Sequence, residues 1–357
     1  MEMRKKFDEI FEDCTKLGTK IKTDEYHSNG KHPIIDQGQE MVAGFTDLED
    51  GLLDAVPAIV FGDHTRIIKY VDCPFFLGAD GVKVLRSKVP NANYRYLYYA
   101  LKNAKIPNTG YNRHYKWLKE LEIEYPPIDQ QVKTVKVLDK VESIIYNRQN
   151  QLQKLDELVK ARFVEMFGMP VSNTKHWKTE KMNRVAPAVN YSGVFNDAVW
   201  LLNLDMVESQ TGRILNYLIV SKSEIGNSTC AFDTSNVLYS KLRPYLNKVV
   251  IPDRCGFATS ELVPLQPVKE KINREYLAFM LRSDEFVNTI SEKVAGAKMP
   301  RVSMSDFRSF DVPIPPYELQ MQFTDFVHQV DKSKVAVQKS LDEAQLLFDS
   351  LMQQYFG

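Results

Sequence analysis

The sequence lacks the loops with which proteins hold nucleotide phosphates. Its 357 residues contain neither the Gly-x-x-x-x-Gly-Lys-Ser/Thr loop of nucleotide triphosphatases nor the Gly-x-Gly-x-x-Gly turn of dinucleotide-binding domains. The four cysteines show no Cys-x-x-Cys spacing, which argues against a zinc site and against a disulfide framework. They are Cys14, Cys73, Cys230 and Cys255. We therefore expect no bound metal, no nucleotide-driven motor and reduced thiols.

No apolar run approaches the length that crosses a membrane, which is roughly 18 residues or more. The first residues, MEMRKKFDEIF, are charged and do not resemble a secretion signal. A Gly/Ser-rich linker is also missing. We therefore expect a cytoplasmic protein whose domains are joined by regular elements, and the length predicts two domains.

The chain has no net charge, because 46 basic residues balance 46 acidic ones. Neutrality at first sight speaks against a nucleic-acid partner, but the balance is uneven along the chain. Lys241, Arg243, Lys248 and Arg254 stand close together, with Asp253 as the acidic residue among them. A local basic patch binds phosphate even in a neutral protein, although a solvated loop with four basic residues is also common.

One type of segment occurs twice in the sequence. Pro126, Pro127, Gln131, Val141, Leu152, Phe167 and Gly168 recur 189 residues later as Pro315, Pro316, Gln320, Val330, Leu341, Phe356 and Gly357. Each copy starts with two prolines, continues for about forty residues without Gly or Pro, and stops at Phe-Gly. This pattern predicts a long helix with a defined start and end in residues 126–168 and again in 315–357.

Apolar residues in both segments follow the alternating three-and-four spacing of a coiled-coil seam. We predict that the packing between the two helices is made by Leu138, Ile145, Leu152, Leu155, Val159, Val337, Leu341, Phe348 and Leu351. Roughly forty helical residues span about 60 Å, which is longer than a small domain is wide, so the other helix is the expected partner. The alternative is that each stripe packs only on its own domain.

The remaining segments, 1–125 and 169–314, are predicted to be globular. Short β-rich runs such as AVPAIVFGD and SNVLYSKL are separated by turn residues, and amphipathic helices follow at Tyr94 to Lys102 and at Arg274 to Lys293. In each domain one apolar segment leads into a polar, basic turn, as in IVFGDHTR and NVLYSKLRP. The predicted fold class is therefore α+β, with two globular domains joined by two long antiparallel coiled-coil helices in an internal repeat.

Catalytic patterns are weak. Asp63 and His64 are adjacent, but the second half has no matching pair, and an Asp-His pair in a turn is more often structural than catalytic. The double prolines resemble the Asn/Asp-Pro-Pro-Tyr motif of adenine methyltransferases, but Tyr125 and Ile314 stand where that motif has its polar residue. The prolines are better explained as helix starts, so a self-contained methyltransferase is disfavoured.

The order of these segments resembles the DNA specificity subunit of type I restriction-modification enzymes over essentially the whole chain. The repeated double proline, Gln and long helix carry the resemblance, together with two sets of strings. YHSNGKHPIIDQGQEMVAGFTD, FGDHTR and FFLGADGVKVLR are similar to one class of target-recognition domain, and VLYSKLRPYLNKVV, SELVPL and GAKMPRVS are similar to another.

The resemblance implies a subunit that is not itself an enzyme. Residues 1–125 and 169–314 would be target-recognition domains, and 126–168 and 315–357 would be helical spacers, with methyltransferase docked on the central one. Because the two halves differ, the implied target in double-stranded DNA is asymmetric and bipartite. The implied partners are two adenine methyltransferase subunits that use S-adenosylmethionine, and restriction subunits that use ATP and Mg. This chain itself would bind no cofactor.

The candidate DNA-contacting residues lie in polar turns that follow apolar strands. Their chemistry suits phosphate and base-edge contacts, although ordinary turn chemistry explains each of them as well. They are Gln37, Gln39, His64, Thr65, Arg66, Ser240, Lys241, Arg243, Tyr245 and Lys248. Arg113 and Arg301, near the domain–helix junctions, either touch phosphate or brace the junction.

A rival interpretation is a coiled-coil scaffold or interaction protein that does not bind DNA. It explains the two helices equally well. It does not explain why the paired domains diverge while their connectors stay alike.

Overall fold

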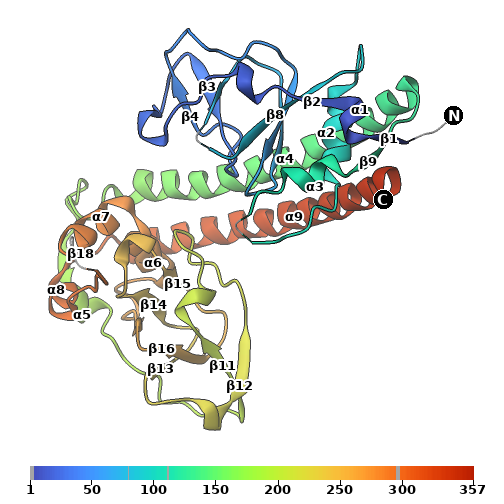
Figure 1. The fold of residues 1–357 in the computed structure, drawn as a ribbon. Helices are drawn as coiled ribbons and strands as arrows, with labels where there is room; N and C mark the ends of the chain where they lie inside the picture. Colours follow the sequence, from blue (N-terminus) through green and yellow to red (C-terminus); the bar gives the residue numbers. More distant parts are fainter. Residues whose placement is uncertain (1–3, 79, 111, 295–297) are drawn as a thin grey trace. The chain divides into compact units, whose positions relative to one another are not determined.

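The computed structural model describes residues 4–78, 80–110, 112–294 and 298–357 (Figure 1). Ala79 of the FFLGADGVKVLR string, Tyr111, and Gly296 and Ala297 of the GAKMPRVS string lie outside the described residues. The chain divides into two compact units. Unit 1 consists of Met1–Gln149 with Lys339–Gly357, and unit 2 consists of Asn150–Gln338.

Both predicted long helices are present. Helices α4 (Ile128–Phe167) and α9 (Tyr317–Phe356) have 40 residues each, and each begins directly after a double proline. Proline fixes a helical φ and lacks the N–H that a first helical turn cannot use, so the prolines define the start. At the end of α4, Gly168 has a φ of +77° and donates to the carbonyl of Val164, which is a glycine stop.

A repeated glutamine secures each of these starts. Gln131 and Gln320 are almost fully buried, and the side-chain amide of each donates to the carbonyl of the first proline, at 2.8 Å from Pro126 O and 2.8 Å from Pro315 O. Gln320 also accepts from the backbone N–H of Asn273 at 2.7 Å. The glutamine therefore recurs because it satisfies a buried turn, which is a structural role.

Unit 1 contains a four-stranded sheet in the order β2-β8-β5-β6, a three-stranded sheet β4-β3-β7 and a β1-β9 pair. The strands are β1 (Arg4–Lys6), β2 (Phe11–Asp13), β3 (His32–Ile35), β4 (Gly44–Thr46), β5 (Ala58–Gly62), β6 (Ile68–Val71), β7 (Phe76–Leu77), β8 (Val82–Ser87) and β9 (Glu122–Glu124). The short helices are α1 (Phe7–Ile10), α2 (Tyr94–Lys102) and α3 (Tyr115–Lys119). Helix α2 has the predicted bounds and is capped by the side chain of Asn93.

Unit 2 contains a four-stranded sheet β12-β11-β16-β13, a three-stranded sheet β15-β14-β17 and a β10-β18 pair. The strands are β10 (Thr179–Lys181), β11 (Ala198–Leu202), β12 (Leu218–Ser221), β13 (Thr229–Phe232), β14 (Val237–Ser240), β15 (Val249–Val250), β16 (Gly256–Thr259), β17 (Leu262–Leu265) and β18 (Asp311–Pro313). The short helices are α5 (Met182–Val185), α6 (Arg274–Arg282), α7 (Asp284–Glu292) and α8 (Met304–Ser309).

One predicted helix is corrected by the structure. The sequence suggested a single helix from Arg274 to Lys293, but α6 and α7 are separated at Ser283, whose backbone is extended at φ −61° and ψ 141°. The Ser283 side chain accepts from the N–H of Phe286 and so starts a new helix. A serine inside an amphipathic stretch was the missed signal.

The two units repeat the same local arrangement. In each, a short strand and a one-turn helix (β1 and α1, or β10 and α5) precede the variable part, and that strand pairs with the strand just before the double proline. The tyrosines Tyr96 and Tyr276 in α2 and α6 donate to the carbonyls of Glu124 and Pro313, both at 3.0 Å. The predicted α+β class with an internal repeat is confirmed.

The long helices belong to the cores of both units. In unit 1, Leu138 and Val141 of α4 and Phe348 and Met352 of α9 share one core with α2. In unit 2, Val159 and other residues from the second part of α4 share a core with α6 and the first part of α9, whose contribution includes Phe323 and Val327. Within each unit, the seam therefore packs on the other helix and on a globular domain at once.

The predicted packing residues have unequal burial. Leu138, Val159, Val337 and Phe348 are buried. Ile145, Leu152, Leu155, Leu341 and Leu351 are partly buried. Lys334, which interrupts the seam, lies 2.6 Å from the carboxylate of Asp156 on α4 within unit 2. The predicted domain boundaries stay a prediction, because each unit combines one globular part with portions of both helices. No helix in the described part of the chain is long and apolar enough to span a membrane.

Candidate nucleic-acid interface

Two hairpin turns carry most of the candidate DNA-contacting residues. Turn A (residues 63–67) joins β5 to β6 in unit 1, and turn B (residues 241–248) joins β14 to β15 in unit 2. Each follows a strand that is hydrogen-bonded on both sides in its sheet, β5 between β8 and β6, and β14 between β15 and β17. Both turns therefore project from an interior strand of a sheet.

Each turn holds an arginine in the left-handed backbone region. Arg66 has a φ of 63° and Arg243 a φ of 50°. Asn247, at the end of turn B, also has a φ of 50°. For a residue with a Cβ this conformation costs about 1 kcal/mol or more, so it persists only where the surroundings enforce it. Such enforced positions are concentrated at functional sites.

Turn A is held by side chains from outside the hairpin. The Gln37 side-chain oxygen accepts from the N–H of His64 at 3.2 Å, and its amide donates to the carbonyl of Asp80 at 3.0 Å. The carbonyl of Asp63 accepts from the backbone N–H of His114 at 2.8 Å and lies 2.9 Å from its ring Nδ1. His114 is fully buried, so these bonds are shielded from water.

The predicted residues of the first domain fall into two groups. Gln39 and Thr65 are exposed, whereas Gln37, His64 and Arg66 are partly buried. The Arg66 guanidinium donates to the carbonyl of Ile106 at 3.3 Å. Gln37 is engaged in holding turn A, so its amide is already used within the protein.

Asp63 and His64 do not work as a pair. The Asp63 carboxylate accepts from the N–H of Tyr115 at 2.7 Å, and the His64 Nδ1 lies 3.2 Å from the carbonyl of Asn112. Each side chain therefore contacts a different backbone group outside turn A, which supports the structural interpretation over acid–base chemistry.

Turn B separates outward-facing from inward-facing residues. Arg243 and Tyr245 are exposed, and Lys241 is partly buried. Ser240 is only 3% exposed, and its hydroxyl donates to the carbonyl of Leu242. The Lys248 ammonium donates to the carbonyl of Leu204 at 2.9 Å, and burial lowers its pKa. Both side chains therefore help to hold the turn, and their predicted contact with DNA stays a prediction.

The two junction arginines differ. Arg301 lies 2.8 Å from the Glu261 carboxylate and pairs through its backbone with Leu242, so it braces turn B. Arg113 is exposed, and its guanidinium makes no hydrogen bond or ion pair with the described residues. Bracing therefore fits Arg301 but not Arg113.

Sequence reasoning missed several residues that fix turn B. Gln210 contacts the backbone of turn B itself, and Gly212 and Arg282 approach the carbonyl of Val249, the residue that follows the turn. Asn247 also went unnoticed, although its side chain donates to the carbonyl of Arg282 at 2.9 Å. Nothing in the local sequence of these residues indicated the contacts, which join segments 33 to 35 residues apart.

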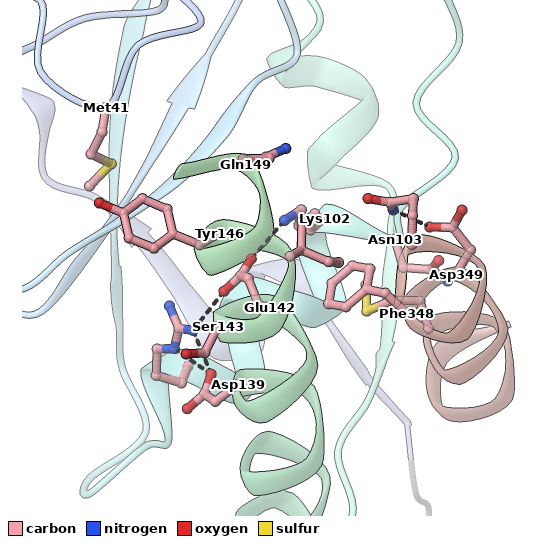
Figure 2. Close-up of a pocket in the computed structure, with 14 residues that line it drawn as sticks. Met41, Lys102, Asn103, Asp139, Glu142, Ser143, Tyr146, Gln149, Phe348 and Asp349 are labelled. Carbon is pink, nitrogen blue, oxygen red and sulfur yellow. Dashed lines mark hydrogen bonds and ion pairs between the residues drawn. The ribbon is translucent and has the colours of Figure 1, made fainter. Parts of the chain in front are cut away.

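A pocket of about 1070 Å³ lies in unit 1 between α2, α4 and α9. Figure 2 shows Lys102 of α2 pointing toward Glu142 of α4, and the two side chains are 3.0 Å apart. Arg95 donates to Asp139 at 3.0 Å and to Glu142 at 2.9 Å. Burial acts to raise the pKa of Glu142, but Lys102 and the neighbouring hydrogen-bond donors outweigh it and hold that pKa below its ordinary value.

Four charged groups that line this pocket are paired with one another, namely Arg95, Lys102, Asp139 and Glu142. They therefore join the globular part of unit 1 to α4. Within the described ranges, no three His, Cys, Asp or Glu side chains gather in a way that could hold a metal ion.

Comparison with known proteins gives one consistent result. A family model described as the type I restriction modification DNA specificity domain matches residues 3–157 and 165–344. The specificity subunit of the type I restriction enzyme EcoDI from Escherichia coli is 25% identical over 147 residues, which is 41% of this chain and 32% of that protein. The EcoR124I/EcoR124II specificity subunit, also from Escherichia coli, is 30% identical over 84 residues, or 23% of this chain and 21% of that protein. The alignments thus span about a third or less of these relatives.

Two solved structures resemble the whole chain. The S subunit of a type I restriction-modification system from M. genitalium matches with a TM-score of 0.59 at 16% identity, covering 99% of this chain and 96% of that one. A chain from a study of complex assembly and conformational transition of the type I R-M system matches with a TM-score of 0.52 at 14% identity, covering 99% and 97%. At these identities the likeness establishes the fold.

Proposed function

The chain belongs to the family of type I restriction modification DNA specificity domains, and from this membership we propose that it reads DNA sequence for a type I restriction-modification complex. Each globular domain would contact one half-site of a double-stranded target. Because the two domains differ in sequence, the half-sites would differ, and the target would be asymmetric and bipartite.

One observation supports this proposal above the others. Two otherwise unlike domains each present a hairpin turn with an arginine in the left-handed region, directly after a central strand. A turn that is held on an interior strand can enter a DNA groove without the entropy cost of becoming ordered first. Arginine is the residue that pairs bidentately with guanine and also contacts phosphate.

We propose fewer DNA-contacting residues than the sequence suggested. In the first domain we propose Gln39, Thr65 and Arg66, with His64 beside them. In the second we propose Lys241, Arg243 and Tyr245. The three remaining candidates, Gln37, Ser240 and Lys248, would act by holding the turns.

Catalysis would come from other subunits. We propose two adenine methyltransferase subunits that use S-adenosylmethionine, docked on the long helices, and restriction subunits that use ATP and Mg to cut DNA. This chain would bind none of these cofactors and would direct the chemistry by choosing where the complex sits.

The test is methylome sequencing of a methylation-free bacterial host. The host would express the cognate methyltransferase subunit with this chain, or the methyltransferase alone. We expect modified adenines in one asymmetric, gapped motif that appears only when this chain is present. Replacing Arg243 and Tyr245 with alanine should relax one half-site only, by about 1–3 kcal/mol at a position that is read directly.

A matched control comes from the same domain. Lys269 is exposed and lies outside turn B, so Lys269→Ala should leave the motif unchanged. If both proteins are soluble and co-purify but no new motif appears, DNA reading is refuted and a coiled-coil scaffold becomes the better description.

A further inference from the structure

Arg282 holds the carbonyl that ends turn B. It is the last residue of α6, and its guanidinium donates twice to the carbonyl oxygen of Val249, from Nε at 3.1 Å and from Nη2 at 2.6 Å. Val249 is the first residue of β15 and is buried. The point at which turn B rejoins the sheet is therefore fixed from the side of the helix.

A second bond runs in the opposite direction. The Asn247 side chain donates to the carbonyl of Arg282 at 2.9 Å. Asn247 is buried and has the left-handed φ of 50° noted above. Arg282 thus contacts Asn247 of turn B through its backbone carbonyl and Val249 of β15 through its side chain, on either side of Lys248.

A neighbouring turn completes the support. Gln210 donates from its backbone to the carbonyl of Leu246 at 3.0 Å and from its side chain to the carbonyl of Tyr245 at 2.9 Å. A Cβ on Gly212, which has a φ of +69°, would lie 1.8 Å from the carbonyl oxygen of Val249 and 2.6 Å from the Arg282 guanidinium. Only glycine permits this approach.

Stability alone does not account for an arginine at this place. Arg282 as a whole is partly buried, and burial of its guanidinium lowers its pKa, with Asp331 and Asp156 acting in the opposite direction. Its guanidinium forms no ion pair with the described residues, and an apolar side chain of similar size usually fills such a space at lower cost. What the guanidinium provides, and an apolar group does not, is a fork of donors with fixed geometry.

We propose that Arg282 is a positioning residue for sequence reading by the second domain. By fixing the Val249 carbonyl, and with the help of Gln210 and Gly212, it sets the orientation in which turn B presents Arg243 and Tyr245 to the duplex. This inference rests on the proposed function and adds a residue that touches no DNA itself. Rigid presentation matters because a contact misplaced by about 1 Å loses much of its energy.

The test compares two substitutions in one helix, in the full chain assembled with its methyltransferase. Arg282→Lys keeps the charge but cannot form the two-pronged bond, whereas Arg274→Lys in the same helix serves as the matched control, because Arg274 donates to Thr234 and pairs with Glu275. The probes are a duplex that carries the methylated motif, duplexes with single changes in either half-site, and a duplex without the motif.

Arg282→Lys should bind the motif about tenfold more weakly and discriminate less among bases in one half-site only. Binding to the duplex without the motif, its salt dependence and discrimination at the other half-site should not change. A purely structural role would lower thermal stability without moving one half-site's preference. Arg274→Lys should behave as the unmodified chain.

A second variant keeps the test decisive if Arg282→Lys fails to fold. Gln210 is exposed, so Gln210→Met should fold, and it should weaken discrimination in the same half-site by about threefold. The inference is overturned if Arg282→Lys and Gln210→Met both read the motif as the unmodified chain does. If the unmodified chain shows no motif, the proposed function falls, and this inference falls with it.

Discussion

Arg243 is held in a backbone conformation that a residue with a Cβ adopts only under constraint. Its backbone N–H donates to the carbonyl of Pro300 at 2.8 Å, and its own carbonyl accepts from Leu246. The guanidinium contributes nothing to this network, because it forms no hydrogen bond with the described residues. Backbone and side chain therefore have separate roles at this position.

That separation gives a prediction at residue 243. Arg243→Gly should leave the free energy of unfolding unchanged or raise it by up to about 1 kcal/mol, because glycine accepts a positive φ without strain. The same change should weaken binding to the motif by at least about tenfold, since the proposed base contact is lost. Urea unfolding and duplex binding of the same preparation measure the two effects.

A matched glycine substitution serves as the control. Arg274→Gly lies at the start of the ordinary helix α6, also loses the ion pair with Glu275, and should cost at least about 1 kcal/mol of stability. If Arg243→Gly destabilises the protein as much as Arg274→Gly does, the backbone argument is incorrect. If it binds the motif normally, Arg243 is not a base contact.

At the scale of elements, paired charges join α2 to α4 in unit 1. Glu142 accepts from Lys102 at 3.0 Å, from Arg95 at 2.9 Å and from the hydroxyl of Tyr99 at 3.0 Å. Removing one partner from such a network lowers the free energy of unfolding by more than that partner contributes on balance. The reason is that the remaining charged groups stay partly buried without it. The charged groups that line the pocket in Figure 2 thus attach the globular part of unit 1 to the long helix α4.

The network predicts a dependence of stability on pH. The folded pKa of Glu142 lies below its ordinary value of 4.5, so its stabilising effect is complete above that value and is lost as pH falls through the folded pKa. Glu142→Gln should therefore lower the free energy of unfolding by about 1–2 kcal/mol at neutral pH. The difference from the unmodified chain should shrink below pH 4.5.

Urea unfolding at several values between neutral and acid pH measures this difference. Glu157→Gln is a suitable control, because Glu157 is exposed on the same helix and its carboxylate accepts from the neutral side chain of Gln153. A Glu142→Gln effect of constant size across the whole range would contradict the electrostatic explanation.

At the scale of the whole molecule, the end of the chain completes a core that begins near its start. Phe348 and Met352 of α9 are buried in the core of unit 1 with α2 and α4. The ring of Phe356 lies 5.2 Å from that of Tyr96, and the ring of Phe348 lies 6.1 Å from that of Tyr99. Phe167 at the end of α4 has the corresponding place in unit 2, with its ring 4.8 Å from that of Tyr276.

Deletion of residues 348–357 should therefore destabilise unit 1 and spare the core of unit 2. Loss of two buried large side chains, a Phe and a Met, costs about 2–5 kcal/mol each, which is a large share of the stability of a domain. Hydrogen exchange should show reduced protection in β5, β8 and α2, with β14 and α6 unaffected. Equal loss of protection in both units would show that they do not have separate cores.

The predictable parts of the fold were those with local causes. The double prolines, the glycine stop and the spacing of apolar residues fixed α4 and α9 to within two residues at each start. The boundary between α6 and α7 was missed because a single serine cap is a weak signal inside an amphipathic stretch. The turns were correctly located, but the direction of each side chain within them was not.

The candidate site shows the same limit more sharply. Gln37 and Ser240 were predicted to contact DNA because they are polar residues next to apolar strands, and that contact stays a prediction. Their roles depend on bonds to partners that the sequence does not place beside them, such as the bond between Gln37 and His64 across 27 residues. Arg282 was invisible as a support of turn B for the same reason, since its bond to Val249 spans 33 residues.

The sequence by itself determined that this protein has two long helices, an internal repeat and two unlike domains, because proline, glycine and apolar spacing act over a few neighbouring residues. Only the tertiary structure decided which part of each helix belongs to which core, and which polar side chains face outward. Those outcomes depend on burial and on hydrogen bonds between segments far apart in the chain. These interactions form only when the folded structure brings the segments into contact.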